Sequence, residues 1–466
     1  MTAQVIVLGC GIAGLTAAAA LASHGAQVTV LDRDRPPAGP APRAGVPQGR
    51  HLHGLLSSGA EAMDALLPGT MDALYSLGAH RIGLPHQTQI YGPHGWMHPF
   101  PSRHYIVGAT RPLVEHTLRT RLTPQVRFLP ATEAVGLLGS AGRVTGVLTR
   151  SRPDGAESTL AATLVVDATG RSTRTPRWLT GLGLPPVHTT VVDSQLAYAS
   201  RLLRPTAAQP LPDCVTVQPD PRCGEPGRGG FFLRVENGCW MVTLSGTRGA
   251  HPPTDDAGFR RFAASLRHPL IAELLDRTEP AGRTVVHRNT ANRRHHYDRA
   301  PAWPAGLLVI GDAATTFNPL YGQGMSVAAH SALALRQALR TTGLSALTSS
   351  TDCHRIQRTV CRTADLPWLL CSTEDIRYPG ATGPRPGPAV RLAQYAADRL
   401  RTAATTRPAA SAAFFAAVAL SAPAHRLATP AALWDVLLGP GAPPRHHPVP
   451  EPHPDHAPRS AAREQP

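Results

Sequence analysis

Residues 5–22 read VIVLGCGIAGLTAAAALA, and this stretch decides the fold class. A short apolar run leads into the pattern Gly9-x-Gly11-x-x-Gly14, and an Ala/Leu-rich run follows it directly. This order predicts a buried strand, a tight turn and a helix. Residues 28–31 form a second apolar run soon afterwards. The chain is therefore expected to begin with a parallel β-α-β unit of the dinucleotide-binding type.

The three glycines of this turn have distinct physical roles in binding a nucleotide. Gly9 permits the tight turn, Gly11 lets the backbone approach a pyrophosphate, and Gly14 allows the helix to pack closely on the strand. The phosphates then lie at the helix N-terminus, where the N–H groups of residues such as Ile12 and Ala13 are free. The turn predicts a dinucleotide site but does not distinguish FAD from NAD.

An acidic residue at the end of the second strand indicates which adenosine the site prefers. Asp32, followed by Arg33, lies 23 positions after Gly9. A carboxylate at this place hydrogen-bonds a ribose hydroxyl, which favours an adenosine without a 2′-phosphate. We therefore predict that Asp32 and Arg33 belong to the cofactor site.

A second glycine-rich segment, far along the chain, points to a flavin. Apolar residues 307–310 lead into a Gly-Asp pair and then into the start of an Ala/Leu-rich helix. A carboxylate at a strand end offers an acceptor for ribityl hydroxyls, and the helix start offers N–H dipoles to the pyrimidine edge of the flavin. FAD is thus the expected cofactor. The contacts predicted from this segment are Gly311, Asp312, Pro319, Gly322, Gln323, Gly324 and Met325.

Turn signals indicate antiparallel structure between these two segments. Apolar stretches within residues 132–164 are separated by short Ser/Gly and Pro-Asp-Gly turns, which predicts a meander. Asn237-Gly238 lies between the apolar runs 231–235 and 239–244 and predicts a two-residue hairpin. A second sheet is expected over residues 190–300.

The fold class predicted from these patterns is α/β with a two-domain α+β arrangement. A Rossmann-like FAD-binding domain is joined to an antiparallel substrate-domain sheet and to C-terminal helices. The last residues are rich in Pro, His and Arg and cannot bury enough apolar surface to order themselves. The expected boundaries are 1–90, 106–180 and 300–345 for the FAD-binding domain, 91–105 and 181–299 for the substrate domain, 346–440 for the helical region and 441–466 for a disordered tail.

Composition excludes several classes of function. The net charge is +15, but all 46 basic residues are Arg, spread along the 466 positions without a dense basic block. We attribute the charge to compositional bias and expect no nucleic-acid partner. The absence of Lys excludes Schiff-base chemistry. The seven Cys have no metal-ligand spacing, so no metal site is expected. The chain shows no leader and no apolar run long enough to span a bilayer, and a cytoplasmic protein is expected.

Three segments match, in order and separation, the fingerprints of a known superfamily. Residues 9–14, 167–172 (DATGRS) and 311–312 resemble those of the para-hydroxybenzoate hydroxylase-like flavoproteins, although Ala168-Thr169 stands where that superfamily usually has Gly. Further motifs resemble a narrower group, the bacterial squalene-epoxidase-like enzymes that epoxidise polyene precursors of polyether polyketides. These motifs are residues 43–53 (RAGVPQGRHLH), 95–101 (GWMHPFP), 291–294 (ANRR) with His296 and Tyr297, and 317–325 (FNPLYGQGM).

The resemblance covers residues 4 to about 440 and implies additional site residues. Arg43, Arg50 and Arg111 are implied to lie near the cofactor, together with Thr169 and Gly170 of the middle fingerprint. The substrate pocket is expected among aromatic residues. The six are Trp96, Phe100, Phe232, Trp240, Phe317 and Tyr321. The polyether enzymes tend to carry His at the position of Gln323, and this departure leaves the substrate open.

The activity implied by the resemblance is FAD-dependent epoxidation of carbon–carbon double bonds in an apolar polyene natural-product intermediate. The flavin C4a-hydroperoxide carries the oxygen transfer, so no protein residue is predicted to be catalytic. Dioxygen is the co-substrate, and NAD(P)H supplies electrons directly or through a separate flavin reductase.

Two alternatives share the same cofactor motifs. An aromatic hydroxylase would benefit from a base that deprotonates a phenol, and His98, His104, Tyr105 and Tyr321 are the possible bases. A redox-neutral FAD-containing cyclase would need no oxygen transfer. A flavin halogenase is disfavoured because the chain has no Lys and no W-x-W-x-I-P motif.

Overall fold

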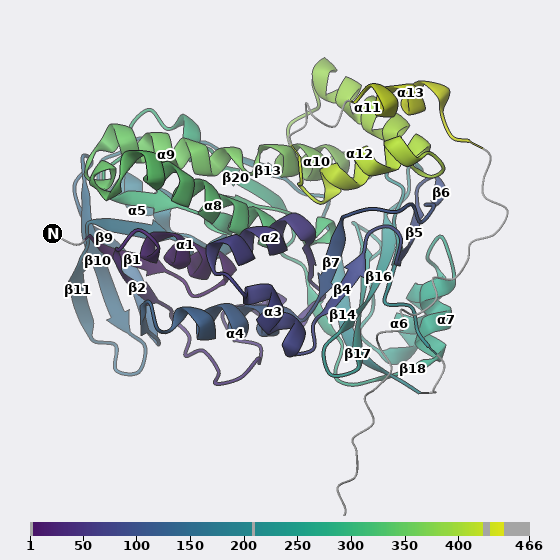
Figure 1. Ribbon diagram of the computed structural model, residues 1–466, viewed down its shortest axis with the longest axis horizontal. Helices are drawn as coiled ribbons and strands as arrows, with labels where there is room; N and C mark the ends of the chain where they lie inside the picture. Colours follow the sequence, from purple (N-terminus) through teal and green to yellow (C-terminus); the bar gives the residue numbers. More distant parts are fainter. Residues whose placement is uncertain (1–2, 207–209, 423–428, 442–466) are drawn as a thin grey trace, which may run out of the picture.

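A parallel sheet forms the centre of one half of the molecule, as the glycine-rich stretch predicts (Figure 1). The computed structural model describes residues 3–206, 210–422 and 429–441. The strand order is β21-β12-β1-β2-β8, and every neighbouring pair is parallel. The strands are β1 (Gln4–Leu8), β2 (Gln27–Leu31), β8 (Arg127–Leu129), β12 (Leu164–Asp167) and β21 (Leu307–Val309).

The register of this sheet brings three distant motifs to one edge. Leu8 lies opposite both Leu31 and Asp167, and Asp167 lies opposite Val309. The carboxyl ends of four strands are therefore level, and ligands of open parallel sheets bind outside these ends.

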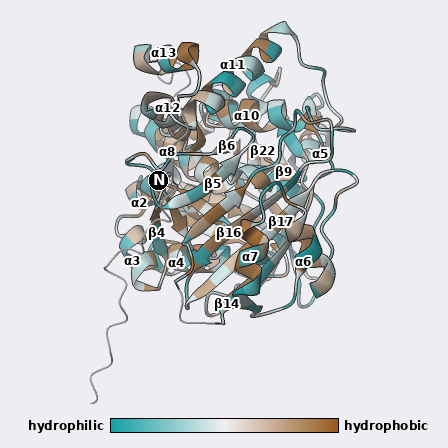
Figure 2. Ribbon diagram, turned by 90° about the vertical axis from the view of Figure 1, so that its right-hand side faces the viewer, coloured by the Kyte–Doolittle hydropathy of each residue, from teal (hydrophilic) through white to brown (hydrophobic). Residues whose placement is uncertain are grey.

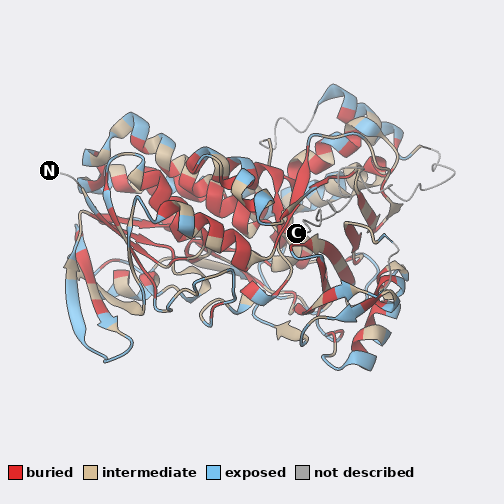
Figure 3. Cartoon of the chain, turned by 60° about the horizontal axis from the view of Figure 1, so that its bottom comes forward, coloured by how far each residue is buried: buried red, intermediate tan, exposed pale blue. Residues whose placement is uncertain are grey.

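Helices cover this sheet because small residues allow close packing. Helix α1 (Ile12–Ala22) is almost entirely apolar, and nine of its eleven residues are buried. It packs against α8 (Gly324–Thr342), which in turn packs against α2 (Ser57–Leu66) and α9 (Ser350–Arg362). Ala has the highest helix propensity and lets helix axes approach closely. Figure 3 shows the buried residues gathered in the interior of the molecule and the exposed residues on its outer surface, and five of the thirteen residues of α9 are buried.

The predicted meander is present beside the parallel sheet. Strands β9 (Thr132–Gly139), β10 (Val144–Ser151) and β11 (Glu157–Ala161) pair antiparallel in the order β11-β10-β9. The third apolar stretch of the prediction ended at Leu164, but that residue begins the parallel strand β12. The stretch is thus divided between two sheets.

A large, mostly antiparallel sheet forms the other half, in the order β18-β14-β17-β16-β15-β5-β6, with β19 paired to β14. Its central hairpin, β16 (Arg228–Val235) and β17 (Cys239–Gly246), turns at Asn237 and Gly238, both with positive φ as the prediction requires. The sheet also includes β5, which begins at Thr88, three residues before the expected start of the substrate domain at residue 91. The other strands are β5 (Thr88–Gly92), β6 (Gly95–Trp96), β14 (Ala197–Pro205), β15 (Cys214–Val217), β18 (Thr278–Pro280) and β19 (Val285–His287).

Short sheets and helices connect the two halves. There are also two small sheets of three strands each, in the orders β3-β7-β4 and β13-β20-β22. Helices α6 and α7 cover the large antiparallel sheet. Their bounds are β3 (Gly54–Leu56), β4 (His80–Gly83), β7 (Tyr105–Gly108), β13 (Thr189–Val192), β20 (Asn292–His295), β22 (Thr315–Thr316), α3 (Thr70–Ser76), α4 (Arg111–Leu122), α5 (Thr175–Gly181), α6 (Asp256–Ala264) and α7 (Leu270–Asp276).

Four helices end the described chain, and Figure 2 shows them gathered along one end of the molecule. They are α10 (Asp365–Asp375), α11 (Pro388–Ala404), α12 (Pro408–Val418) and α13 (Pro430–Leu438). The Pro- and Gly-rich residues 379–387 separate α10 from α11. The predicted tail, apart from Gly441, lies outside the described residues. Within the described ranges, no helix is both long and apolar enough to cross a membrane.

Candidate active site

One cavity of about 760 Å³ connects the motif-bearing edge of the parallel sheet to the large antiparallel sheet. Its size falls in the range of cavities that bind cofactors and small molecules. The sequence-predicted cofactor residues that line it are Gly9, Gly11, Ile12, Ala13, Asp32, Arg33, Arg43, Arg111, Thr169, Gly170, Asp312, Pro319, Gly322, Gln323, Gly324 and Met325.

The Gly9–Gly14 turn leaves room for a ligand only on its cavity side. A Cβ at Gly14 would lie 1.9 Å from the Gly9 carbonyl oxygen, and a Cβ at Gly9 would lie 2.7 Å from the Ala168 oxygen. Both glycines are thus required by packing. Gly11 is the N-cap of α1 and supplies no side-chain cap, and no acidic residue lies in the first turn. The free N–H groups therefore face the cavity, as a pyrophosphate requires.

A buried network of charges lies beside this turn. The Asp32 carboxylate accepts hydrogen bonds from the Cys10 N–H at 2.7 Å and from Arg43 Nη1 at 2.8 Å. Arg43 also donates to Glu115 at 3.1 Å, and Glu115 accepts from Arg111 Nε at 2.8 Å. Arg43 and Arg111, which the resemblance implies to lie near the cofactor, both line the cavity. Glu115 was not predicted, although its spacing of four from Arg111 on one helix was a usable signal.

Asp312 lies where the second motif predicts a carboxylate. A Cβ added at Gly324 would be 3.8 Å from Asp312 Oδ1, and one at Gly170 would be 3.9 Å from its Cβ. Burial raises the pKa of Asp312, and Arg171 is the largest of the charges that oppose this shift. Gly322, with a φ of +65°, turns the chain into the uncapped start of α8. One carboxylate and one open helix N-terminus therefore meet, as a flavin would require.

Unsatisfied donors on the same wall strengthen the fit to FAD. Arg171 lines the cavity, and its Nη1 donates to the Ala291 oxygen at 2.9 Å. Its Nε and Nη2 are buried without a hydrogen-bond partner. Buried donors are normally paired, so these two indicate a missing acceptor. The residues present thus fit FAD, which would have pyrophosphate and carbonyl oxygens for these donors.

The loop before α8 is held by a buried carboxylate from the C-terminal helices. Asp375 accepts hydrogen bonds from Asn292 Nδ2 at 2.7 Å, from Asn318 Nδ2 at 2.8 Å and from the Tyr321 hydroxyl at 2.8 Å. Burial raises the pKa of Asp375 to about 6, although these three donors oppose the shift. Sequence reasoning missed Asp375, because nothing in its local pattern indicates contact with a loop 54 positions away.

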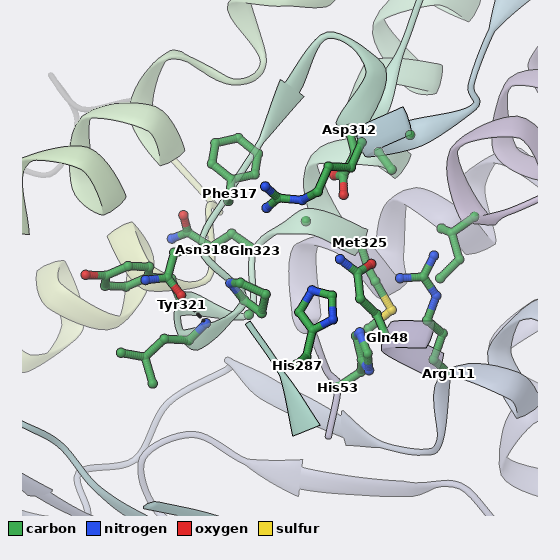
Figure 4. A pocket seen from close by; sticks show the side chains of 18 of the residues that line it. Gln48, His53, Arg111, His287, Asp312, Phe317, Asn318, Tyr321, Gln323 and Met325 are labelled. Atoms are coloured by element: carbon green, nitrogen blue, oxygen red, sulfur yellow. Dashed lines mark hydrogen bonds between the residues drawn. The ribbon is translucent and has the colours of Figure 1, made fainter. Parts of the chain in front are cut away.

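Histidines on the opposite wall are neutral. Figure 4 shows His53 and His287 across the cavity from Asp312 and Phe317. Burial lowers the pKa of His53 to about 3, with a further contribution from Arg111. Burial also lowers the pKa of His287. Neither imidazole is therefore a strong base at neutral pH. Of the bases considered from sequence, only Tyr321 lines the cavity, and burial raises its pKa well above the usual value.

The end of the cavity away from the glycine turn is largely apolar. Its wall comes from β5, β7, β16 and the helices α10 and α12. The apolar side chains are Leu56, Leu84, Ile90, Ile106, Leu196, Val217, Phe231, Phe317, Leu370, Phe414, Phe415 and Val418. Two charged residues, Glu374 and Arg401, face this end as an ion pair at 3.0 Å.

The aromatic residues predicted for this pocket divide into two groups. Phe317 and Tyr321 line the cavity. Phe232 and Trp240 do not, and their prediction is wrong: both belong to the apolar core between the large sheet and α6 and α7. Side chains alternate across a strand, so Phe231 faces the cavity and Phe232 faces the core.

Five other predicted residues lie off the cavity wall. Trp96 contacts the rings of Tyr91 and His268 at the sheet edge, and the half-buried Phe100 packs on the ring of His98. Arg50 is exposed on the surface, because its short helix turns it outward. Gly311 packs on α1, where a Cβ would lie 2.5 Å from that of Ala13. Gly14 is likewise a packing residue.

Comparisons with known proteins agree with this geometry. The model of the FAD binding domain family matches residues 2–343. Protein Rv3254 of Mycobacterium tuberculosis is 32% identical over 395 residues, which is 81% of each chain. The myxobacterial chondrochloren halogenase CndH, an FAD-dependent halogenase, is similar with a TM-score of 0.59 at 18% identity, covering 87% of this chain and 91% of its own. PqsL from Pseudomonas aeruginosa, described as a probable FAD-dependent monooxygenase, has a TM-score of 0.58 at 16% identity, covering 81% and 98%.

The chain belongs to the FAD binding domain family. Its fold is that of the para-hydroxybenzoate hydroxylase-like flavoproteins, and the predicted fold class is confirmed. The prediction of FAD as the cofactor is confirmed with it.

Proposed function

We propose that the protein is an FAD-dependent monooxygenase that epoxidises carbon–carbon double bonds of an apolar polyene. The observation that supports this most directly is the cavity of about 760 Å³, which runs from the FAD-binding turns to an apolar wall. When bound, FAD would supply the chemistry that accepts electrons and transfers one oxygen atom from dioxygen. The protein's own residues bind, orient and shield the two reactants.

The apolar wall suits an alkene better than a phenol. An alkene offers no hydrogen bonds, so a site for it needs shape and exclusion of water rather than polar partners. Phe231, Phe317 and Phe414 provide such surface on the cavity wall. We infer that the substrate lies between these aromatic side chains and the flavin.

The electrostatics of the described wall disfavour phenol hydroxylation. Deprotonating a phenol benefits from a base whose pKa lies near the working pH. His53 is neutral with a pKa of about 3, Tyr321 has a strongly raised pKa, and Glu374 is held in ion pairs with Arg401 and Arg377. An epoxidation needs no such base.

Oxygen labelling tests this function. The purified protein with bound FAD would be given a reductant, ¹⁸O-labelled dioxygen and linear trisubstituted polyenes. We expect substrate-dependent appearance of an epoxide that carries one labelled atom. A labelled phenol from aromatic substrates alone would support the hydroxylase instead. An isomerised product without label would support a redox-neutral cyclase.

We further propose that NAD(P)H supplies the electrons, directly or through a separate flavin reductase. Stopped-flow mixing with NADPH under anaerobic conditions separates these routes. Rapid bleaching of the flavin absorbance would indicate direct reduction. Bleaching only after a reductase is added would indicate the partner.

A further inference from the structure

The three last helices, α11, α12 and α13, form a C-terminal cap with an unusual surface. Seven of the large apolar side chains that are exposed in the described chain lie on α10, α11 and α13, and only two lie elsewhere. The exposed fraction is 62% for Trp434 and 72% for Leu437. Such a concentration of exposed apolar groups on neighbouring helices at one end of the molecule marks an interaction surface.

The exposed groups are continuous between two helices. On α13, Leu433, Trp434, Leu437 and Leu438 share one face by their spacing of four. Only Ala432 of that helix is fully buried.

On α11, Leu392, Tyr395 and Arg399 share a face at spacings of three and four, and Arg399 donates to the carbonyls of residues 436 and 437. The apolar stripe of α11 thus runs to the exposed end of α13. Figures 1 and 2 show both helices at the outer end of the molecule.

The charge around this surface is positive, although Arg401 of α11 pairs with Glu374 of α10 at 3.0 Å. The cap and the residues just before it contain two carboxylates in the described ranges. Asp398 pairs with Arg377 at 2.8 Å, and Asp435 faces Arg407 at 4.0 Å. Arg385 and Arg391 are exposed and have no carboxylate partner among the described residues.

We propose that the C-terminal cap docks on the surface of an anionic lipid bilayer. Leu and Trp side chains on one face, flanked by Arg, are the features that place a helix at the boundary of headgroups and acyl chains. Arginines next to such a face attract anionic lipids. This assignment goes beyond the proposed epoxidation.

Two other occupants fit the surface less well. A second copy bound through the same surface would place two surfaces of the same positive charge against each other, and like charges repel. Residues 442–466 contain a single large aliphatic residue, Val449, and offer little apolar surface to cover Trp434.

The C-terminal cap lies next to the cavity, so docking on a bilayer would bring the cavity close to the lipid. Phe414, Phe415 and Val418 of α12 line the cavity, and so does Arg401 of α11. A bilayer bound to α11 and α13 therefore lies on the side of the molecule from which these helices enclose the cavity. An apolar substrate dissolved in the bilayer could then enter the cavity directly. This delivery of substrate rests on the proposed function, whereas the docking itself does not.

Co-sedimentation of the full-length protein with vesicles tests the docking without any activity assay. Vesicles of phosphatidylcholine alone would be compared with vesicles that also contain phosphatidylglycerol, at low and high salt. We expect binding to the anionic vesicles that weakens with salt. Protein that stays in the supernatant with both vesicle types would overturn the proposal.

Variants locate the contact. Trp434→Ser with Leu437→Ser should lower the partition coefficient about tenfold or more, since both groups are exposed and support no core. Leu77→Ser, at an exposed apolar residue on another helix end, is the matched control and should bind as wild type. Replacing Arg385 and Arg391 by Gln should weaken anionic binding by about fivefold per residue.

Bound flavin and far-UV circular dichroism would confirm that each variant is folded. Cap variants that bind vesicles as well as wild type would refute the assignment. A dimer detected by light scattering that the Trp434→Ser, Leu437→Ser variant dissociates, without vesicle binding by wild type, would assign the surface to a second copy instead.

Discussion

The buried carboxyl of Asp375 should make the stability of the protein depend on pH in an unusual direction. Most carboxylates in folded proteins have lowered pKa values and stabilise the fold as pH rises. Burial instead raises the pKa of Asp375 to about 6 from 3.8. Between these values the folded chain holds a proton that the unfolded chain has released, so stability falls as pH rises through this window.

The expected magnitude follows from the size of the shift. A shift of about two pKa units corresponds to roughly 3 kcal/mol of unfolding free energy. In Asp375→Asn this group no longer titrates. The unfolding free energy of the variant minus that of wild type should therefore rise by about 3 kcal/mol between about pH 4 and pH 7, whatever constant offset the amide introduces.

Urea unfolding followed by circular dichroism at a series of pH values measures this difference. Glu225→Gln, at an exposed residue in a loop, is the control, and its difference from wild type should stay flat. A flat difference for Asp375→Asn as well would show that Asp375 is ionised without penalty in the fold. The reasoning from burial would then be refuted.

Three further predictions concern the two ends of the cavity. Arg43→Met should lower the unfolding free energy by about 3–5 kcal/mol, because it leaves the buried carboxylates of Asp32 and Glu115 without a charge partner. Arg150→Met, which removes an exposed ion pair, should lower it by less than about 1 kcal/mol. Equal losses for the two variants in urea unfolding would contradict this. Gly14→Ala should purify with little FAD, since its Cβ would lie 1.9 Å from the Gly9 oxygen, and a normal ratio of flavin to protein absorbance would count against the packing argument. Phe231→Ala should lower kcat/KM for a polyene by about tenfold or more while the affinity for FAD is unchanged; an unaltered kcat/KM would remove this side chain from the substrate wall.

The cofactor end of the site could be predicted from sequence because its determinants are local. Gly9 and Gly311 follow strands directly, and parallel pairing brings the ends of such strands together. The apolar end depends on which face of a strand meets the cavity. For Phe231 and Phe232 composition cannot decide this, since both are large and apolar.

Long-range contacts account for the other residues that sequence reasoning missed. Glu115 completes a charge cluster with Arg43, 72 positions earlier, and Asp375 holds a loop near Tyr321. Neither of these long-range contacts is implied by a local motif, although the spacing of four between Arg111 and Glu115 signals the local part of the charge cluster. The wall residues from α12 were missed because an Ala-rich helix with two Phe residues is typical of an ordinary core.

The strand order of the parallel sheet has a consequence for how the chain is made. The strand β1 is synthesised first, yet its neighbour β12 comes from residues 164–167, and β21 beyond that comes from residues 307–309. At about 5–20 residues per second, the ribosome needs roughly 15–60 s to supply the last of these strands. During that interval the open sheet edge is a surface for mispairing. The nascent chain therefore depends on protection of this edge until its final third emerges, and only then can FAD bind and complete the fold.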